Sequence, residues 1–221
     1  MDVSSAVQAR RSVRGFLDRP VDPALLRELA LKSARAATGG NLQPWHVDIV
    51  HGASMARLKE IMRGKIERRE SETPGYDIYP REIPETMEKR RFQIGELLYG
   101  NLGIPREDRR ARAIWFSRNF QFFGAPAGYF VTVDRRMGPP QWADLGMYLQ
   151  NLMLLAVEAG LATCPQECWA VYPATVEGFL GTPPERMLFC GVAIGYEDKD
   201  EPANRTLAPR APEAEWLTEF S

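Results

Sequence analysis

The sequence predicts an α+β fold in which helices flank both sides of a small mixed sheet. Two apolar runs, residues 126–133 and 187–194, are typical of buried strands. Between them, residues 144–159 are apolar around nearly the whole circumference of a helix, which is typical of burial at a domain centre or a subunit interface. At 221 residues, with no internal repeat or linker, the chain fits one domain over residues 1–221.

Local patterns predict the elements of the first third of the chain. A helix is expected over residues 22–36, with Asp22 as its N-cap and Pro23 at the first helical position. Residues 45–51 alternate in the manner of a strand, with Trp45, Val47 and Ile49 on one side. A second helix with a strongly charged face is expected over residues 53–70.

Residues 71–112 differ in character because they are rich in proline, tyrosine and arginine. Prolines interrupt regular structure, so we expect a loop, a helix over about 84–98, and another loop. A long excursion of this kind is typical of a lid or a substrate-binding insert, and equally of an oligomer contact. A C-terminal arm is expected over about 200–221.

Composition excludes several classes of protein. A formal net charge of −1 lacks the basic excess on which general nucleic-acid or membrane-surface binding depends, so neither partner is expected. No run approaches the ~20 apolar residues of a membrane span, and the first residues lack the pattern of a secretory signal. Three cysteines and two histidines, without a second ligand pair, predict no metal site. A reducing, cytoplasmic location is expected.

Two segments carry residue types that suit a phosphorylated planar ligand. Near the N-terminus, Arg10-Arg11-Ser12-Val13-Arg14 concentrates guanidinium groups and a hydroxyl, which together can grip a phosphate monoester; a solvated basic stretch is the alternative. Further on, Thr38-Gly39-Gly40-Asn41-Leu42-Gln43-Pro44-Trp45 combines a glycine loop with two amides.

The pairing of Arg-Arg-Ser-x-Arg with Gly-Gly-Asn-x-Gln-Pro-Trp resembles the N-terminal signature of the FMN-dependent nitroreductase family. The resemblance continues through Asp144-Leu145-Gly146, residues 150–152, residues 160–166 and Gly195-Tyr196, and so covers nearly the whole chain. It implies an interlocked homodimer with a mainly antiparallel sheet. It also implies an FMN-dependent oxidoreductase that takes hydride from NADH or NADPH and reduces nitroaromatics or quinones by a ping-pong mechanism.

The resemblance also implies the cofactor-binding residues. Arg10 and Ser12 would engage the phosphate, while Arg11 and Arg14 would reach the phosphate, the ribityl chain or the pyrimidine edge. A cation at that edge would stabilise the negative charge that gathers there on reduction, and Arg14 is the preferred donor. A loop along the partner's flavin is implied at Gly40, Asn41 and Gln43. A turn with a backbone N–H at flavin N5 is implied at Pro165, Gln166 and Glu167. The basic residue that returns to the phosphate is Arg210.

Two departures from the family pattern are visible. Thr38-Gly39-Gly40 stands where many members carry Pro-Ser, and Ala208 stands where many carry a second basic residue. Either Arg205 substitutes for that residue or the phosphate relies on the N-terminal arginines.

No catalytic side chain is expected, because flavin N5 performs the hydride transfer and Glu167 is assigned to position rather than to acid–base chemistry. Aromatic and cationic groups suit an electron-poor substrate ring that bears oxyanions. We therefore expect the substrate wall in the insert and in the aromatic segment after it, at Tyr76, Tyr79, Tyr99, Arg90, Arg91, Phe120, Phe122 and Phe123.

Other reactions on the same fold, such as enone reduction, dehalogenation or flavin fragmentation, remain alternatives, as does a non-catalytic flavin-binding protein.

Overall fold

The structure is a computed structural model, and it describes residues 1–220. Seven helices and four strands are found in this part of the chain. In chain order they are α1 (Val3–Ala9), α2 (Pro23–Ser33), β1 (His46–His51), α3 (Gly52–Glu67), α4 (Glu85–Asn101), α5 (Arg109–Ser117), β2 (Ala127–Asp134), α6 (Pro139–Glu158), β3 (Ala162–Gln166), α7 (Pro173–Leu180) and β4 (Arg186–Gly195). Short 3₁₀ turns include η1 (Gly39–Asn41), η2 (Arg118–Gly124), η3 (Glu167–Val171), η4 (Pro202–Arg205) and η5 (Glu213–Glu215).

The strands form one sheet in the order β1-β2-β4-β3, and every neighbouring pair is antiparallel. The parallel component that the sequence predicted is limited to an isolated bridge between Ser12 and Thr163, at the free edge of β3. There the Val13 N–H donates to the Thr163 carbonyl at 2.9 Å. The N-terminal arginine segment is therefore fastened beside β3.

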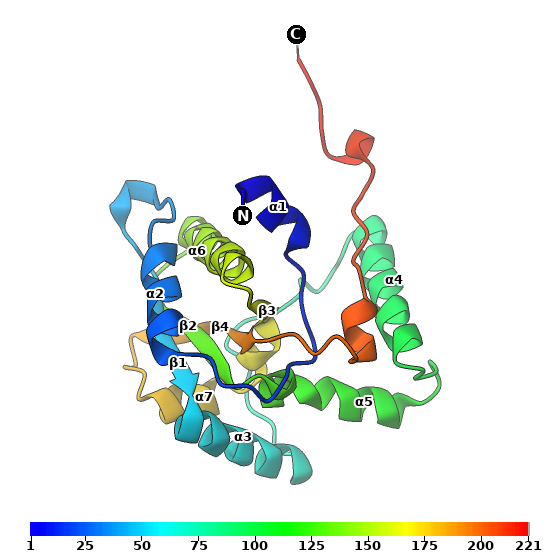
Figure 1. Ribbon diagram of the computed structural model, residues 1–221, viewed down its shortest axis with the longest axis horizontal. Helices are drawn as coiled ribbons and strands as arrows, with labels where there is room; N and C mark the ends of the chain where they lie inside the picture. Colours follow the sequence, from blue (N-terminus) through cyan, green and yellow to red (C-terminus); the bar gives the residue numbers. More distant parts are fainter. Residues whose placement is uncertain (221) are drawn as a thin grey trace.

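Helices cover both faces of the sheet (Figure 1). On one face, α2 and α6 pack against β2 and β4, with Leu26, Leu145 and Tyr129 fully buried. The Tyr129 hydroxyl donates to the Leu26 carbonyl at 2.8 Å, which joins α2 to the sheet. On the other face, α3, α5 and α7 surround an aromatic cluster centred on Trp169. The predicted architecture, with helices on both sides of a small sheet, is confirmed.

Helix α6 is enclosed mainly on the side that faces the sheet in the isolated chain. It begins at Pro139 rather than at Asp144 because two consecutive prolines suit the first turn of a helix. Leu145 and Leu152 are buried against the sheet, whereas Gly146 is exposed and Met147 retains 40% of its surface. Met147 is therefore an exposed apolar side chain of α6 in the isolated chain.

Most predicted elements are confirmed, and the misses have identifiable causes. Asp22 caps α2 by accepting the Ala24 N–H at 2.8 Å. Trp45, Val47 and Ile49 pack on the α2–α6 side of β1, as their alternation predicted. Residues 164–166, expected in a turn, belong to β3, since the proline at 165 is tolerated in an edge strand. Helices α1, α5 and α7 were not predicted.

The C-terminal segment leaves the body of the molecule. After η4 the chain runs beside α4 and then projects beyond the other elements (Figure 1). Ser221, the last residue of the predicted arm, lies outside the described residues. Across residues 1–220, no helix combines the length and apolar character needed to cross a membrane.

Candidate functional site

The segment after α1 and the first part of the C-terminal arm meet at a cavity of about 420 Å³. Arg10, Arg11, Ser12 and Arg14 enter it from the segment that follows α1, and Arg210 enters it from the C-terminal arm. The structure therefore brings the predicted arginine cluster and the predicted C-terminal arginine together. The remaining lining residues are Val7, Gln8, Ala9, Ile94, Thr206, Leu207 and Ala208.

The arginines of this cavity differ in how many ion pairs and hydrogen bonds their guanidinium groups already make within the protein. Arg11 forms an ion pair with Glu197 at 2.5 Å and donates to the Asn204 carbonyl at 2.9 Å. Within residues 1–220, no carboxylate lies at ion-pair distance from Arg10, Arg14 or Arg210. Three guanidinium groups therefore keep donors available for an anion, while Arg11 is largely committed to internal partners.

Strand β3 lies next to this cationic segment. The pKa of the Cys164 thiol is raised to about 11 by burial, and the positive charge of Arg14 acts in the opposite direction. Arg14 is therefore close enough to β3 for its charge to act on Cys164. Because Ser12 bridges Thr163, the predicted phosphate-binding and ring-facing segments are neighbours.

The Gln166 side chain is directed into the protein. It is 2% exposed, and its Nε2 donates to the Asn119 carbonyl at 2.7 Å. Its Oε1 accepts the Trp169 indole N–H at 3.3 Å. The Gln166 side chain is therefore occupied by internal partners, and only its backbone atoms can contact a ligand. The neighbouring Glu167 side chain stays exposed, while surrounding protein atoms raise the pKa of its carboxyl by desolvation.

The glycine–amide loop is held by a buried carboxylate of α6. Asp144 is 5% exposed, and its Oδ2 accepts the Thr38 hydroxyl at 2.9 Å and the Gly39 N–H at 3.2 Å. The Thr38 hydroxyl in turn accepts the Gln43 N–H at 3.0 Å. Asn41 adopts a φ of 56° and Gln43 a φ of 50°, a left-handed conformation that asparagine tolerates but that is costly for glutamine.

This loop does not face the arginine cavity of its own chain. Figure 1 places it beyond α2, on the other side of the molecule from α4 and the C-terminal arm. Gly40, Asn41 and Gln43 are exposed there.

The predicted substrate wall requires a correction at its phenylalanines. Phe122 and Phe123 are 0% and 1% exposed and belong to the aromatic core, so they cannot line a substrate site. Phe120, at 4%, is buried with them. Both Phe122 and Phe123 have φ near +50°, and the absence of a side chain at Gly128 makes room for the Phe122 ring.

Two of the predicted tyrosines, Tyr76 and Tyr99, are half-buried in the flanks of the core, whereas Tyr79 is exposed. The Tyr76 ring packs against Trp142 and Phe189, and its hydroxyl donates to the Phe189 carbonyl. Desolvation is the main reason why the pKa of Tyr76 is raised well above its usual value. Tyr99 packs edge-on against Trp115, with its ring centroid 5.9 Å away. Neither tyrosine lines the arginine cavity.

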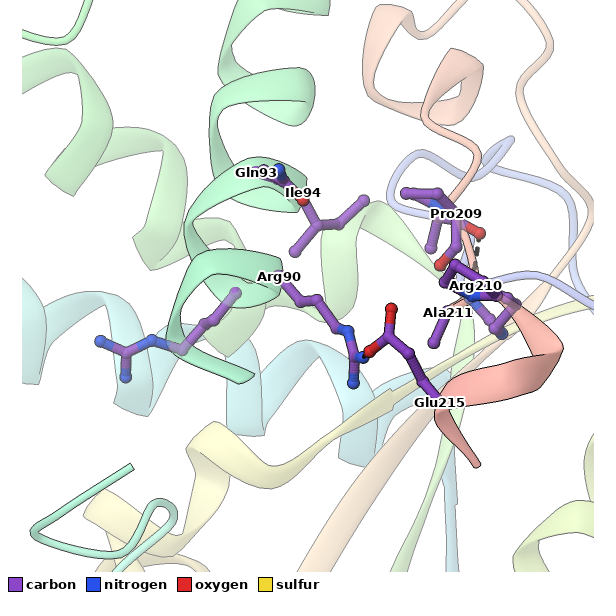
Figure 2. A pocket seen from close by; sticks show the side chains of 10 residues that line it. Arg90, Gln93, Ile94, Pro209, Arg210, Ala211 and Glu215 are labelled. Atoms are coloured by element: carbon purple, nitrogen blue, oxygen red, sulfur yellow. Dashed lines mark hydrogen bonds and ion pairs between the residues drawn. The ribbon is translucent and has the colours of Figure 1, made fainter. Parts of the chain in front are cut away.

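A second groove, of about 410 Å³, lies between α4 and the arm and shares Arg210 with the cavity. Arg91 lines it, and its guanidinium also stacks over the exposed ring of Tyr79 at 4.8 Å. Figure 2 shows Arg90 reaching from α4 to Glu215 of the arm, with which it forms an ion pair. The arm is therefore held against α4 on one side of this groove.

Sequence reasoning missed several residues of this region. Ile94 lines both cavities, and Thr206 and Leu207 line the arginine cavity. Asn204 accepts a hydrogen bond from the Arg14 N–H, and Glu197 forms an ion pair with Arg11. No local motif marks these positions, because their roles arise from contacts between distant parts of the chain. The described residues contain no group of three side chains that could hold a metal ion.

Comparison with known proteins agrees with this geometry. A family model described as the nitroreductase family matches residues 7–196. The chain belongs to the nitroreductase family. A 4-nitrobenzoate reductase of Pseudomonas putida is 32% identical over 209 residues, which are 95% of this chain and 91% of that protein.

Solved structures of the same family share the whole fold. An FMN- and NADPH-dependent nitroreductase, NfnB from Sphigopyxis sp. strain HMH, is 46% identical with a TM-score of 0.95, and the match covers 100% of both chains. An FMN-dependent nitroreductase, NfnB from Mycobacterium smegmatis in complex with NADPH, is 30% identical with a TM-score of 0.92, again over 100% of both chains.

Proposed function

We propose that this chain is an FMN-dependent NAD(P)H oxidoreductase that reduces nitroaromatics, and that quinones serve as further acceptors. The observation that carries the proposal is the cavity in which Arg10, Arg14 and Arg210 keep free guanidinium donors. A terminal phosphate dianion satisfies such a donor set, whereas a neutral ligand would leave it uncompensated. The FMN and NADPH dependence of the related structures supports the same assignment.

The chain's residues fit FMN in the following way. Arg10, Ser12 and Arg210 hold the phosphate, and Arg14 places positive charge at the pyrimidine edge. The backbone of residues 165–167 would lie toward the reactive side of the ring. FMN held there would supply hydride-transfer chemistry, with NADH or NADPH as donor and the nitroaromatic or quinone as acceptor. No side chain of this chain is required as an acid or a base.

The acceptor's binding site is proposed at the insert of residues 71–112. Arg91 and the groove beside Arg210 offer cationic and apolar surface to an aromatic ring that bears oxyanions. Relatives that act on 4-nitrobenzoate support this class of substrate. Tyr76 and Tyr99 contribute from the flanks of the insert, where their rings stay partly exposed.

A homodimer completes the site in this proposal. Trp216 and Phe220 of the arm are 68% and 96% exposed in the isolated chain, and Met147 of α6 is 40% exposed. Exposed apolar side chains of this kind suit an interface between subunits, and an obligate interface is expected to bury more than about 2,000 Å². The loop at Gly40 and Asn41 would then lie along the flavin of the other subunit. Sedimentation at micromolar concentration tests this, and an active, flavin-loaded monomer contradicts it.

Steady-state kinetics test the reaction itself. With 4-nitrobenzoate and NADPH varied together, the double-reciprocal lines should be parallel, as in a ping-pong mechanism. A matched screen with a quinone, an enone and a halogenated aromatic separates the proposed reaction from others that this fold supports. Turnover of the enone or the halogenated compound alone would replace the proposal, and reduction of no acceptor would indicate a flavin-binding protein without this activity.

A further inference from the structure

One buried amide holds the N-terminal arginine segment in place. Asn204, in η4, is 4% exposed, and its Oδ1 accepts the Arg14 N–H at 2.6 Å. Its Nδ2 donates to the Gly15 carbonyl at 2.9 Å and to the Asp198 carbonyl at 2.7 Å. Its own carbonyl accepts a guanidinium N–H of Arg11 at 2.9 Å. Asn204 therefore contacts the segment through both its side chain and its backbone.

The surrounding contacts leave this segment little room to move. A Cβ at Gly15 would lie 2.2 Å from the Cγ of Glu201, whose carboxylate pairs with Arg118 at 2.9 Å. The Leu17 N–H donates to the Tyr196 carbonyl at 2.9 Å. On its other side the segment is bridged to β3. Its position is therefore set between β3 and the turn that carries Asn204.

We propose that Asn204 is a positioning residue for the flavin site, and this inference rests on the proposed function. Its side chain fixes the backbone of Arg14, and its carbonyl orients the Arg11 guanidinium beside Glu197. The chain that leaves Asn204 leads directly to Arg210. Asn204 thus sets the relative positions of the ring-facing arginine and the arm arginine that binds phosphate.

Loss of this amide has a specific structural consequence. In Asn204→Ala, the Arg14 N–H and the carbonyls of Gly15 and Asp198 lose buried partners, and the segment relaxes to find others. A small displacement of a positioned charge has a large effect on binding and reactivity. We expect the FMN dissociation constant to rise about tenfold or more, and the midpoint potential of the bound flavin to fall as Arg14 withdraws.

The experiment compares Asn204→Ala and Asn204→Ser with wild type and with Gln121→Ala. Gln121 is a matched control, because its amide also donates to two backbone carbonyls, those of Lys59 and Phe120, outside the arginine cavity. FMN affinity is measured by quenching of flavin fluorescence, and midpoint potentials are measured at saturating FMN. The serine variant, which keeps one hydroxyl, should show a smaller change in the same direction, and Gln121→Ala should match wild type.

A double substitution distinguishes positioning from general destabilisation. If Asn204 acts through Arg14, Asn204→Ala should not lower the potential further in an Arg14→Ala background. Equal potentials and affinities in wild type and both Asn204 variants would overturn the inference, as would a full additional shift in the double variant.

Hydrogen exchange of the wild-type protein gives a test that needs no variant. The Arg14 amide should be strongly protected in the flavin-free protein, and exchange at an unprotected rate would overturn the inference. Failure of wild type to bind FMN, with the Arg14 amide still protected, would count against the proposed function instead.

Discussion

Replacing Asp144 with alanine tests how the glycine–amide loop keeps its shape. The carboxylate of Asp144 is buried in α6, and it is joined to the loop through the Thr38 hydroxyl and the Gly39 N–H. The loop itself contains Asn41 and Gln43 in the left-handed conformation, which costs about 1–2 kcal/mol at Gln43 and less at Asn41, because asparagine tolerates it. The anchor at Asp144 therefore opposes a loop that would otherwise relax.

The hydrogen bonds of Asp144 determine how much stability its replacement should cost. A hydrogen bond to a charged group contributes roughly 1.5–3 kcal/mol. Asp144→Ala removes two such bonds, but the Gly39 N–H lies at an exposed position where water can replace its partner. We therefore expect a loss of about 2–4 kcal/mol in the free energy of unfolding. Asp144→Asn keeps a neutral acceptor, so its loss should be about half as large.

Chemical denaturation measures the global loss, and hydrogen exchange measures the local one. Amides of residues 38–43 should exchange faster in Asp144→Ala, while those of the central strands keep their order of protection. Asp22→Ala is the control, since Asp22 also accepts a backbone N–H but caps α2 at an exposed position. Unchanged loop exchange together with a stability within about 0.5 kcal/mol of wild type would refute the reasoning.

Three further substitutions test other parts of the structure. Gly15→Ala should lower the free energy of unfolding by about 1–3 kcal/mol, because the new Cβ overlaps the Glu201 side chain close to its backbone. Burial alone would raise the pKa of Glu72, but hydrogen bonds from Thr175 and a lysine outweigh it and lower that pKa below 4.5. The charged form of Glu72 therefore adds stability above pH 4.5, and this stability is lost as the pH falls through the lowered pKa. Glu72→Gln should lower the free energy of unfolding by roughly 1–3 kcal/mol at pH 7 and by less in acid. Denaturation at several pH values measures this difference. Arg14→Ala, saturated with FMN, should lower the flavin's midpoint potential and slow its reduction by NADPH in stopped-flow measurements.

Each of these has a control or a contrary result. Gly178→Ala lies in α7 with no atom within 4 Å of the added Cβ, so it should be neutral or stabilising by up to ~1 kcal/mol. A Gly15 variant as stable as this control would contradict the packing described here. A Glu72→Gln cost that is the same at pH 3 and pH 7 would contradict the lowered pKa. If the Arg14 variant keeps the wild-type midpoint potential and rate of flavin reduction, the charge of Arg14 does not act on the flavin ring, and Arg14 is only a phosphate or structural contact.

The elements that could be predicted are those whose signals are local. Asp22 and Pro23 mark the start of α2, and strict alternation marks β1 with the correct side facing α2 and α6. By contrast, β3 contains Pro165 and lies at an edge, so its strand character depends on pairing with β4. The start of α5 also carries a local signal in the sequence, an N-cap residue: Asp108 accepts the Ala111 N–H at 2.8 Å.

The same distinction applies to the candidate site. Arginine motifs can be read from sequence, and the structure places Arg10, Arg14 and Arg210 around one cavity. Whether a phenylalanine faces a ligand or a core cannot be read locally, and Phe122 turned out to be core. Hydrogen-bonding centres such as Asn204 are equally hidden, because their partners come from segments that only the fold brings together.

Visible absorbance of the purified protein, followed anaerobically during addition of NADPH, tests the central claim most directly. The account predicts a yellow protein whose flavin bands bleach as NADPH is added and whose flavin, once released by heat, is FMN rather than FAD. A protein that binds no flavin after reconstitution would contradict the account. So would a bound flavin that stays oxidised in the presence of both NADPH and NADH.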